Sequence, residues 1–347
     1  MRFYTEKHRH YCGIDLHART MYLCIVNGEG KILLHQNMPA APESFLAAVK
    51  RFRQDLVVAV ECMFTWYWLA DCCAQNDIPF VLGHALYIKA IHGSKVKNDR
   101  IDCKKLALLL RGGLFPMAYV YPSELRATRD LLRRRMYFMR KRAELNVHVQ
   151  NTNSQYNLAP LPGKIAYKKN RADVSGRFAD PAARKSVDLD LALMDTYDSL
   201  LREVEGHIRD HARAHDHDAL RRLQTIPGVG KILALAILYE VGGIDRFSRV
   251  QDFVSYCRLV KPQIESGGKV YGHSGKKIGN AHLKWAFSEA ACLFLRQNPE
   301  AQAYYARLKR KHPPGKALAV LAHKIGRATY FILKRRTDFD MTKFING

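Results

Sequence analysis

The chain has 347 residues, of which 56 are Lys or Arg and 32 are Asp or Glu, so its formal net charge is +24 with histidine neutral. Chains of this length usually fold as two or three domains of about 100–200 residues. The positive charge indicates nucleic acid or another polyanion as partner. No apolar run approaches the ~20 residues that cross a bilayer. The charged start, MRFYTEKHRHYC, is unlike a signal peptide, so we expect a cytoplasmic protein without a membrane partner.

Eight cysteines are scattered through apolar stretches of the chain. They form no CxxC pair and no Cys/His zinc pattern. We therefore predict reduced cysteines that lie in the cores of a cytosolic protein. They are Cys12, Cys24, Cys62, Cys72, Cys73, Cys103, Cys257 and Cys292.

Short strand-like runs alternate with helical runs from Tyr11 to about Gly113. Three strand-like runs come first: YCGIDLH, TMYLCIVN and KILLHQN. A helix (PESFLAAVKRF), a strand (LVVAVE), a helix (WYWLADCCAQN), a strand (IPFVLGH) and a helix (NDRIDCKKLALLLRGG) follow. Three strands in a meander, followed by alternating helix and strand, is the order of the ribonuclease-H-like fold. We predict such a domain over residues 1–121.

After Pro122 the sequence becomes helical and strongly basic. Residues 123–157 predict a long helix, and eight Lys or Arg but one acid lie between Arg126 and Arg142. This density of positive charge favours a helix face that binds a phosphate backbone. The alternative is a solvated helix face without a partner. Residues 158–184, rich in Pro, Gly and Lys, predict a loop or hinge before a second long helix. We therefore expect residues 122–217 to form a coiled-coil arm, with phosphate contacts from Arg133, Arg134 and Arg135.

The last predicted domain, residues 218–347, is mainly helical, so the whole chain is of the α/β plus α class. It begins with IPGVG ahead of an apolar helix, which is the form of a helix-hairpin-helix turn. Gly228 and Gly230 would let backbone amides approach a phosphate. A plain tight turn between two helices is an equally good explanation. A polar, Gly-rich passage and two further helices complete the chain.

Four carboxylates of the first domain are spaced so that they can share a metal ion. Asp15 ends the first predicted strand, Glu61 ends the fourth, and Asp99 and Asp102 lie one helical turn apart. The first and fourth strands of a ribonuclease-H-like sheet are neighbours, so we expect the four acids to converge. Their repulsion calls for a cation, and Mg²⁺ suits hard oxygen ligands. Two such ions can clamp a phosphodiester during displacement, which indicates phosphoryl transfer on nucleic acid.

Each of these residues also has an ordinary structural explanation. Acids are favoured in the first turn of a helix by its dipole, and Glu61 can be a solvated strand end. His17, just after Asp15, could tune the metal site, although a histidine at a strand end is more often a hydrogen-bonded structural group. Lys104 and Lys105, beside Asp102, are candidate phosphate contacts.

Several segments, in the same order along the chain, carry a resemblance to a known family. They are GIDLH at 13–17, VEC in the fourth strand, KNDRIDCKKLALLL, IPGVG and RLVKPQIESGGKVYGHSGKKIGNAHLKWAF. Together they resemble the transposases of insertion-sequence family 110, which also includes the Piv-like DNA invertases. The resemblance covers nearly the whole chain. It implies a RuvC-like domain with a DEDD carboxylate set, a coiled-coil arm, and a C-terminal transposase domain with a serine.

Position by position, the resemblance assigns a metal set and a nucleophile. It implies a recombinase whose serine hydroxyl attacks DNA to give a covalent phosphoserine intermediate. It also implies target and donor double-stranded DNA, a structured bridge RNA that pairs with both, and a dimer or tetramer whose protomers combine serine and carboxylates. Such a protein acts at the bacterial nucleoid. The residues implied are Asp15, Glu61, Asp99 and Asp102 for Mg²⁺, and Ser266 for the nucleophile.

One departure from the family pattern concerns the serine. The family commonly has two adjacent serines before the glycines, whereas this chain has Glu265-Ser266. Ser266 aligns with the second serine, and Ser274 is a nearby competitor. Three lysines are predicted to stabilise the charge that develops at the serine: Lys269, Lys276 and Lys277.

Two other functions stay open at the level of the sequence. A metal-dependent nuclease resembling a Holliday-junction resolvase would use water in place of serine and leave no covalent adduct. A non-catalytic RNA- or DNA-binding protein would act through its basic helices, and its carboxylates would be structural. All three readings predict salt-sensitive binding, so binding alone does not separate them.

Overall fold

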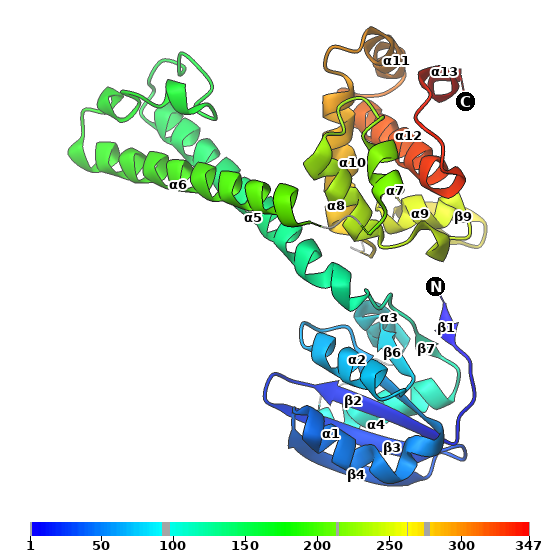
Figure 1. Ribbon diagram of the computed structural model, residues 1–347. Coiled ribbons are helices and arrows are strands. Elements are labelled where there is room, and N and C mark those ends of the chain that lie inside the picture. The colour runs from blue at the N-terminus through cyan, green and yellow to red at the C-terminus, as the bar shows by residue number, and fades with distance from the viewer. Residues whose placement is uncertain (1, 92–97, 213–214, 262, 274–277, 347) are drawn as a thin grey trace. The chain divides into compact units, whose positions relative to one another are not determined.

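The computed structural model describes residues 2–91, 98–212, 215–261, 263–273 and 278–346 (Figure 1). The chain divides into two compact units, Met1–Ser123 and Glu124–Gly347. The first unit is mixed α/β and the second is mostly helical. The α/β plus α class predicted from the sequence is therefore confirmed.

A five-stranded sheet with strand order β4-β3-β2-β5-β6 forms the centre of the first unit. The pairs β2–β3 and β3–β4 are antiparallel, and the pairs β2–β5 and β5–β6 are parallel. The predicted meander, and the predicted adjacency of the first and fourth strands, are both confirmed. The strands are β2 (His10–Leu16), β3 (Thr20–Asn27), β4 (Ile32–Pro39), β5 (Leu56–Glu61) and β6 (Phe80–Gly83).

Helices cover both faces of this sheet. On one face, Leu106 and Leu110 of α4 pack against Val57 and Ala59 of β5. On the other face, α1 and α2 contribute buried side chains such as Phe45 to a second apolar cluster. The helices of this unit are α1 (Pro42–Val49), α2 (Trp66–Gln75), α3 (Ala85–Ile91) and α4 (Asp99–Arg111), with a 3-10 turn at Lys50–Asp55.

A small ribbon in the first unit has no counterpart in the sequence prediction. It pairs β1 (Phe3–Tyr4) with β7 (Phe115–Pro116) in an antiparallel arrangement. The helix α3 was not predicted either. Two-residue strands and a seven-residue helix are too short for the periodicity that reveals longer elements.

Two long antiparallel helices open the second unit (Figure 1). An ion pair joins Arg135 to Glu205, and another joins His148 to Asp190, so positions later in the first helix meet positions earlier in the second. The predicted helices of residues 122–217 are thus present. They are α5 (Ser123–Gln155) and α6 (Pro181–His211).

The connection between these helices, predicted as a loop or hinge, is a packed loop with an apolar core of its own. Ile165, Val174 and Phe178 of the loop are buried against Val149 of α5 and Val187 of α6. The sequence pattern concealed this core because its apolar residues are separated by Lys, Pro and Gly. Two 3-10 turns, Lys168–Asn170 and Ser175–Arg177, complete the loop.

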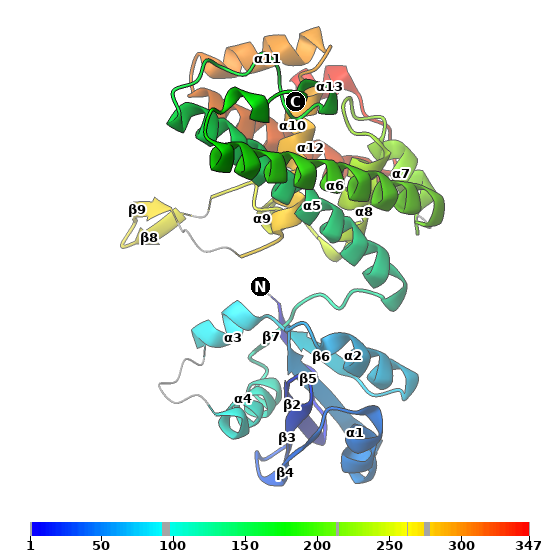
Figure 2. The same cartoon turned by 90° about the vertical axis from the view of Figure 1, so that its left-hand side faces the viewer.

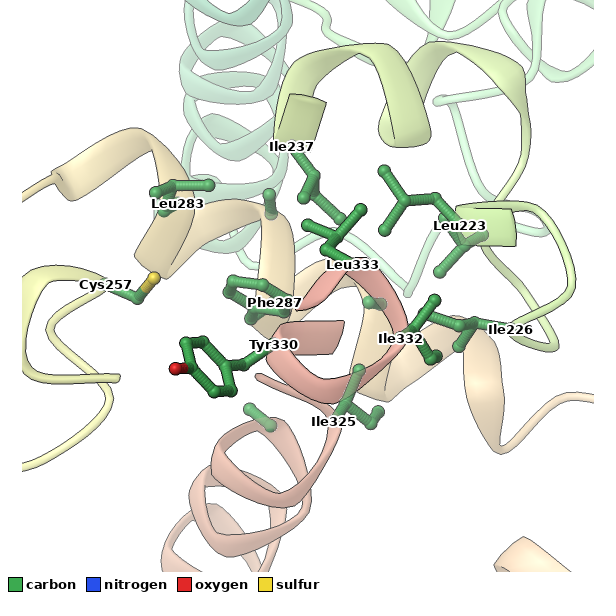
Figure 3. Close-up of a cluster of buried hydrophobic side chains, with 14 of the residues drawn as sticks. Leu223, Ile226, Ile237, Cys257, Leu283, Phe287, Ile325, Tyr330, Ile332 and Leu333 are labelled. Carbon is green, nitrogen blue, oxygen red and sulfur yellow. The ribbon is translucent and has the colours of Figure 1, made fainter. Parts of the chain in front are cut away.

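The remaining helices share a large apolar core. Ile237 of α8, Phe287 of α10 and Tyr330 of α12 meet in the cluster drawn in Figure 3. Every residue of α8 from Leu233 to Val241 is buried, so this helix lies inside the bundle. The helices are α7 (His217–Leu223), α8 (Lys231–Val241), α9 (Val250–Tyr256), α10 (Ala281–Phe294), α11 (Pro299–Lys309), α12 (Pro314–Arg335) and α13 (Met341–Asn346), with a 3-10 turn at Ile244–Arg246.

The cysteines agree with the prediction at six of eight positions, where the side chain is buried. Cys62 and Cys292 are exposed, which corrects the prediction for these two. Cys62 directly follows the last residue of β5, and Cys292 lies among apolar residues of α10 but on a position that the bundle leaves uncovered. Separately, a search of the described helices finds none that is long and apolar enough to cross a membrane.

Candidate active site

The position of α4 on the sheet depends on a glycine of β2. A Cβ added at Gly13 would lie 2.3 Å from both the backbone nitrogen of Ala107 and the carbonyl oxygen of Cys103. Backbone atoms cannot give way as a flexible side chain can, so glycine alone allows this contact. The glycine of the GIDLH motif therefore lets α4 pack directly on the strand that carries Asp15.

Asp15 and Glu61 lie on the face of the sheet that α4 covers. Gly13 of β2 is opposite Ala59 of β5 in the parallel register, and both residues contact α4. Side chains alternate between the two faces of a sheet, so the residues two positions further on each strand point to the same face. The sheet therefore presents the two predicted carboxylates together, toward the helix that carries the other two.

Asp15 and Asp99 converge with His17 into a compact group. His17 Nε2 lies 3.6 Å from Asp15 Oδ2 and 3.3 Å from Asp99 Oδ2, and one ligand atom of each residue lies within 4.8 Å of the other two. The side chains are 23%, 49% and 53% exposed for Asp15, His17 and Asp99. Two carboxylate oxygens and an imidazole nitrogen fit a divalent cation, and the exposure leaves room for water or substrate oxygens as further ligands.

The first turn of α4 is fixed by its N-cap. The side-chain oxygen of Asn98 accepts a hydrogen bond from the backbone N–H of Arg100 at 2.9 Å. Asp99 and Asp102 then occupy the first turn, where the helix dipole stabilises negative charge. Asp99 thus stabilises the start of the helix and also lies beside His17, next to the end of β2.

Glu61 and Asp102 stand outside the three-residue group that the described residues form. Asp102 Oδ1 instead accepts from Lys105 Nζ at 3.2 Å, so this lysine, predicted as a phosphate contact, neutralises a carboxylate. Lys104 is exposed on the same helix. The sequence suggested His17 as a group that tunes the site, and the structure places it at its centre.

Ser266 lies at the turn of a two-stranded hairpin, β8 (Gln263–Ser266) and β9 (Lys269–His273) (Figure 2). The two turn residues, Gly267 and Gly268, have φ of +57° and +74°. Positive φ at both positions is what a type I′ turn requires, so these two glycines set the conformation of the turn. A Cβ on either glycine meets no described atom within 4 Å, so the turn is open.

Ser266 and Lys269 are partners across the first rung of this hairpin. Paired residues place their side chains on the same face, and both residues are exposed. A lysine therefore accompanies the serine hydroxyl on an accessible surface. The other predicted residues of this segment, Ser274, Lys276 and Lys277, lie outside the described residues.

The chain that returns from the hairpin is anchored at Asn280. Its side-chain oxygen accepts from the backbone N–H groups of His282 and Leu283 at 2.9 and 3.1 Å and so caps α10. Its Nδ2 donates to Glu240 Oε2 at 2.8 Å. Just before it, Arg258 Nε donates to the carbonyl of Gly279 at 3.0 Å.

Glu240, 1% exposed, joins α5, α8 and α10 through buried charges. Arg129 Nε donates to its Oε2 at 3.1 Å, and Arg133 donates from Nε to Oε1 at 2.5 Å and from Nη2 to Oε2 at 3.0 Å. Burial alone would raise the pKa of this carboxyl. The Arg133 hydrogen bond, the charges of both arginines and the Asn280 bond outweigh burial and hold the pKa below its ordinary value. The sequence signal for this network was a single acid inside the apolar run of α8.

Comparison with known proteins assigns the family. Residues 12–157 match the DEDD profile of IS110 transposases, and residues 220–306 match the profile described as "Transposase IS116/IS110/IS902 family". The chain belongs to the IS110 family of insertion-sequence transposases. The four predicted carboxylates lie inside the first match and Ser266 lies inside the second.

Three relatives of similar length support the assignment of the chain to this family. The transposase for insertion sequence element IS1111A of Coxiella burnetii is 22% identical over 94% of this chain and 90% of its own length. The transposase for insertion sequence element IS1328 of Yersinia enterocolitica is 24% identical over 94% of this chain and 97% of its own. A probable family 20 transposase of Pseudomonas aeruginosa is 23% identical over 88% and 93%, respectively.

The three arginines predicted to contact phosphates have different surroundings in the transposase. Arg133 is bound to Glu240, and Arg135 Nη2 lies 2.7 Å from Glu205 Oε1. Arg134 is exposed, with its guanidinium over the Tyr137 ring at 5.5 Å. Of the three, Arg134 best fits the predicted contact, whereas the other two hold helices together.

The two glycines of the IPGVG turn also differ. Gly228 has φ of +80°, and a Cβ there would lie 2.6 Å from the backbone carbon of Leu293 in α10. This glycine permits close packing of the turn on a neighbouring helix, as the alternative reading of the sequence held. Gly230 is the N-cap of α8, and an added Cβ there would meet no described atom within 4 Å. A phosphate contact therefore stays a prediction for Gly230.

A further basic stretch of the transposase was not predicted from the sequence. Ten Lys or Arg and no acid lie between residues 301 and 337, across α11 and α12. Burial, together with the charges of Arg307 and Arg327, lowers the pKa of Lys324. The absence of acids over such a length was a signal in the sequence as strong as that of α5.

Proposed function

We propose that this transposase cuts and rejoins DNA through a covalent serine–DNA intermediate, with Ser266 as the nucleophile and Mg²⁺ held by Asp15, Glu61, Asp99 and Asp102. The convergence of Asp15, His17 and Asp99 is the observation that carries the proposal, because it supplies ligands for a divalent ion inside a strongly basic protein. A bound Mg²⁺ would stabilise the charge that develops on the phosphate oxygens. Glu61, on the same face of the sheet, and Asp102, on the same helix as Asp99, would complete the ligand set.

The chemistry of the serine divides recombination into two exchanges. The Ser266 oxygen attacks phosphorus and loses its proton, the bond from phosphorus to one bridging oxygen breaks, and that oxygen leaves as the hydroxyl of a DNA end. The product is a phosphodiester between the serine and the other end. Attack by the hydroxyl of a second DNA molecule restores the serine and joins the strands. Lys269, on the same face of the hairpin, offsets the negative charge at the phosphate.

The partners proposed are target and donor double-stranded DNA and a structured bridge RNA that pairs with both. Base pairing would choose the sequences while the protein reads backbone and shape. The net charge of +24 supports more than one nucleic acid on one chain. The α5–α6 pair would serve as a coiled-coil arm and the IPGVG turn as a helix-hairpin-helix contact, in a dimer or tetramer that acts at the bacterial nucleoid.

Replacement of the proposed nucleophile tests the mechanism. The variant Ser266→Ala is expected to lower strand joining by at least about a thousandfold and to form no covalent protein–DNA adduct, because no other group would take the phosphate. Binding of nucleic acid should stay within about twofold, since a single exposed hydroxyl contributes little affinity. The adduct is measured as labelled DNA that stays with the protein after denaturation.

Ser274→Ala is the matched control, and it should form the adduct normally. An adduct in Ser266→Ala that disappears in Ser274→Ala would move the nucleophile to Ser274. Cleavage by the native protein without any adduct, unaffected by either variant, would instead support a resolvase-like nuclease in which water attacks.

A further inference from the structure

The loop between α5 and α6 has a fixed conformation that the proposed reaction does not require. Arg171, 7% exposed, lies at its centre and pairs with Asp195 and Asp198 of α6. Its Nε donates to the carbonyl of Ile165 at 2.8 Å. These ion pairs and the apolar core of the loop hold it against α6, so side chains on the loop keep defined positions.

A cavity of about 460 Å³ lies between this loop and the end of α5. This volume is in the range of small-molecule sites. Its wall combines amide and hydroxyl groups with apolar side chains and one cation. The lining residues are Gln150, Asn153, Ser154, Leu158, Pro160, Leu161, Gly163 and Lys164.

Asn153 contributes a buried acceptor to this cavity. Its Nδ2 donates to the carbonyls of Leu158 and Ala159, both at 3.1 Å, and because both partners are acceptors the amide orientation is fixed. The Oδ1 atom is buried and has no hydrogen-bond partner among the described residues, and the residue is only 5% exposed. Buried polar atoms are nearly always paired, so this oxygen indicates a donor that arrives with a ligand.

Arg177 shares a hydrogen-bond partner with Asn153 but does not line the cavity. Its Nη2 donates to the carbonyl of Ala159, the same oxygen that Asn153 binds. Its Nη1 is buried and, within the described part of the chain, has no hydrogen-bond partner. Of the two unpartnered atoms, only the Asn153 oxygen belongs to a residue that lines the cavity, and every nucleobase carries an N–H donor on its Watson–Crick edge.

The surroundings of the cavity are positively charged. Seven Lys or Arg and two Asp lie between residues 156 and 187. Lys164, at the cavity, is exposed. Leu158 and Leu161 provide apolar contacts for the faces of a planar ring. Neither family profile extends over residues 158–219, so the family match assigns no role to this loop.

We propose that this cavity binds one unpaired nucleobase of a single-stranded nucleic acid, with Asn153 at the edge of the base and Lys164 at the adjacent phosphate. A base inside a duplex has its edge paired and its faces stacked, so only a splayed base can enter. The inference rests on the proposed function only for the presence of a nucleic-acid partner. The loop would then hold a single-stranded part of that partner.

Photo-crosslinking with the full-length protein tests this inference. Single-stranded 12-mers are used, an RNA with one 4-thiouridine and a DNA with one 4-thiothymidine, and cross-linked peptides are identified by mass spectrometry. The cross-link is expected within residues 150–164. Lys164→Ala and Gln150→Ala, both exposed and both outside the loop's core, should weaken binding of the same 12-mer by about tenfold and about threefold.

Lys169→Ala is the matched control, because it removes the same charge from an exposed lysine of the same loop that does not line the cavity. It should weaken binding by less than about twofold. Equal losses of affinity for Lys164→Ala and Lys169→Ala, or cross-links confined to other peptides, would overturn the inference. The loop would then bind nucleic acid only through its positive charge. Whichever of the two oligonucleotides cross-links identifies RNA or DNA as the source of the base.

The adduct assay keeps this inference separate from the proposed function. A cross-link within residues 150–164 together with no serine adduct in the native protein would contradict the recombination mechanism and support the base site. A serine adduct together with no cross-link in these residues would support the mechanism and contradict the base site.

Discussion

At the scale of single residues, the candidate metal site depends on contacts that no local pattern contains. The four carboxylates could be assigned to two strand ends and the first turn of a helix from the sequence, because the apolar periodicity of these elements shows where they begin and end. The sequence also suggested His17, but the contact of His17 with Asp99 could not be predicted, because it arises from the packing of α4 on β2, across more than eighty residues of sequence. The same packing explains why the motif begins with glycine.

Gly13→Ala is therefore expected to damage both the fold and the metal site. A Cβ at 2.3 Å from two backbone atoms of α4 must push the helix away, at a cost of about 3 kcal/mol or more in the free energy of unfolding of the first unit. Because Asp99 moves with the helix, binding of Mn²⁺, a spectroscopic substitute for Mg²⁺, should weaken as well. Urea unfolding and electron paramagnetic resonance titration measure the two effects.

The control for this substitution is Gly28→Ala. Gly28 has no described atom within 4 Å of an added Cβ and no left-handed backbone, so its free energy of unfolding should change by less than about 0.5 kcal/mol. Equal stability of the two variants would show that α4 adapts without loss, and that the glycine has another purpose.

At the scale of elements, long periodic segments were predictable and short or irregular ones were not. The order of strands β2 to β6, and the helices α4, α5 and α6, follow from apolar spacing alone. The hairpin around Ser266 was predicted only as a Gly-rich loop, because its short exposed strands show little alternation and are defined by the type I′ turn. The segment after α5 was predicted only as a loop or hinge, without its apolar core, because that core is built from isolated apolar residues and a buried arginine.

The junction of α5, α8 and α10 is an element-scale feature with a pH signature. Glu240→Gln would remove the buried carboxylate that pairs with Arg129 and Arg133, so the second unit should lose about 3–5 kcal/mol of unfolding free energy at pH 7. The pKa of Glu240 is lowered in the folded state from an ordinary value of 4.5. Its stabilising contribution is therefore complete above about pH 4.5 and is lost as the pH falls through the folded-state pKa.

The measurement is urea unfolding of the native protein and the variant from pH 7 to pH 3. The difference between them should shrink as the pH falls below 4.5. Glu203→Gln, an exposed acid of α6, is the control and should change stability little at any pH. A constant difference across this range would mean that the carboxylate charge does not stabilise the junction.

At the scale of the whole molecule, the positive charge is unevenly divided. Residues 1–123 hold 15 Lys or Arg and 10 Asp or Glu, whereas residues 124–347 hold 41 and 22. The unit with the carboxylate site thus has a formal charge of only +5, and the helical unit, at +19, carries most of the charge available for phosphates. Much of that charge is used internally, as in the pairs of Arg133 and Arg135, so net charge alone overstates the binding surface.

The basic stretch across α11 and α12 contains no acid of its own, and although Lys334 pairs with Asp245, Arg307 is expected to bind phosphate. The lowered pKa of Lys324 reports burial and the repulsion of Arg307 and Arg327, and a bound polyanion would relieve that repulsion. Arg307→Gln should therefore reduce the slope of log K against log salt concentration for duplex DNA by about one unit, the value of a single phosphate contact. Fluorescence anisotropy at several salt concentrations measures this slope.

Arg249→Gln is the control that separates location from net charge. Arg249 is exposed and pairs with Asp252 at 3.0 Å, so the substitution removes the same formal charge from a group that already has a counter-ion. Its effect on the slope should be much smaller than that of Arg307→Gln. If both variants lowered the slope equally, DNA would respond to the total charge of the chain, and α11 and α12 would hold no specific phosphate site. A larger effect of Arg307→Gln than of Arg249→Gln would locate the duplex on α11 and α12. These helices are separate from the serine hairpin in the sequence, so one segment would hold the DNA while another acts on it.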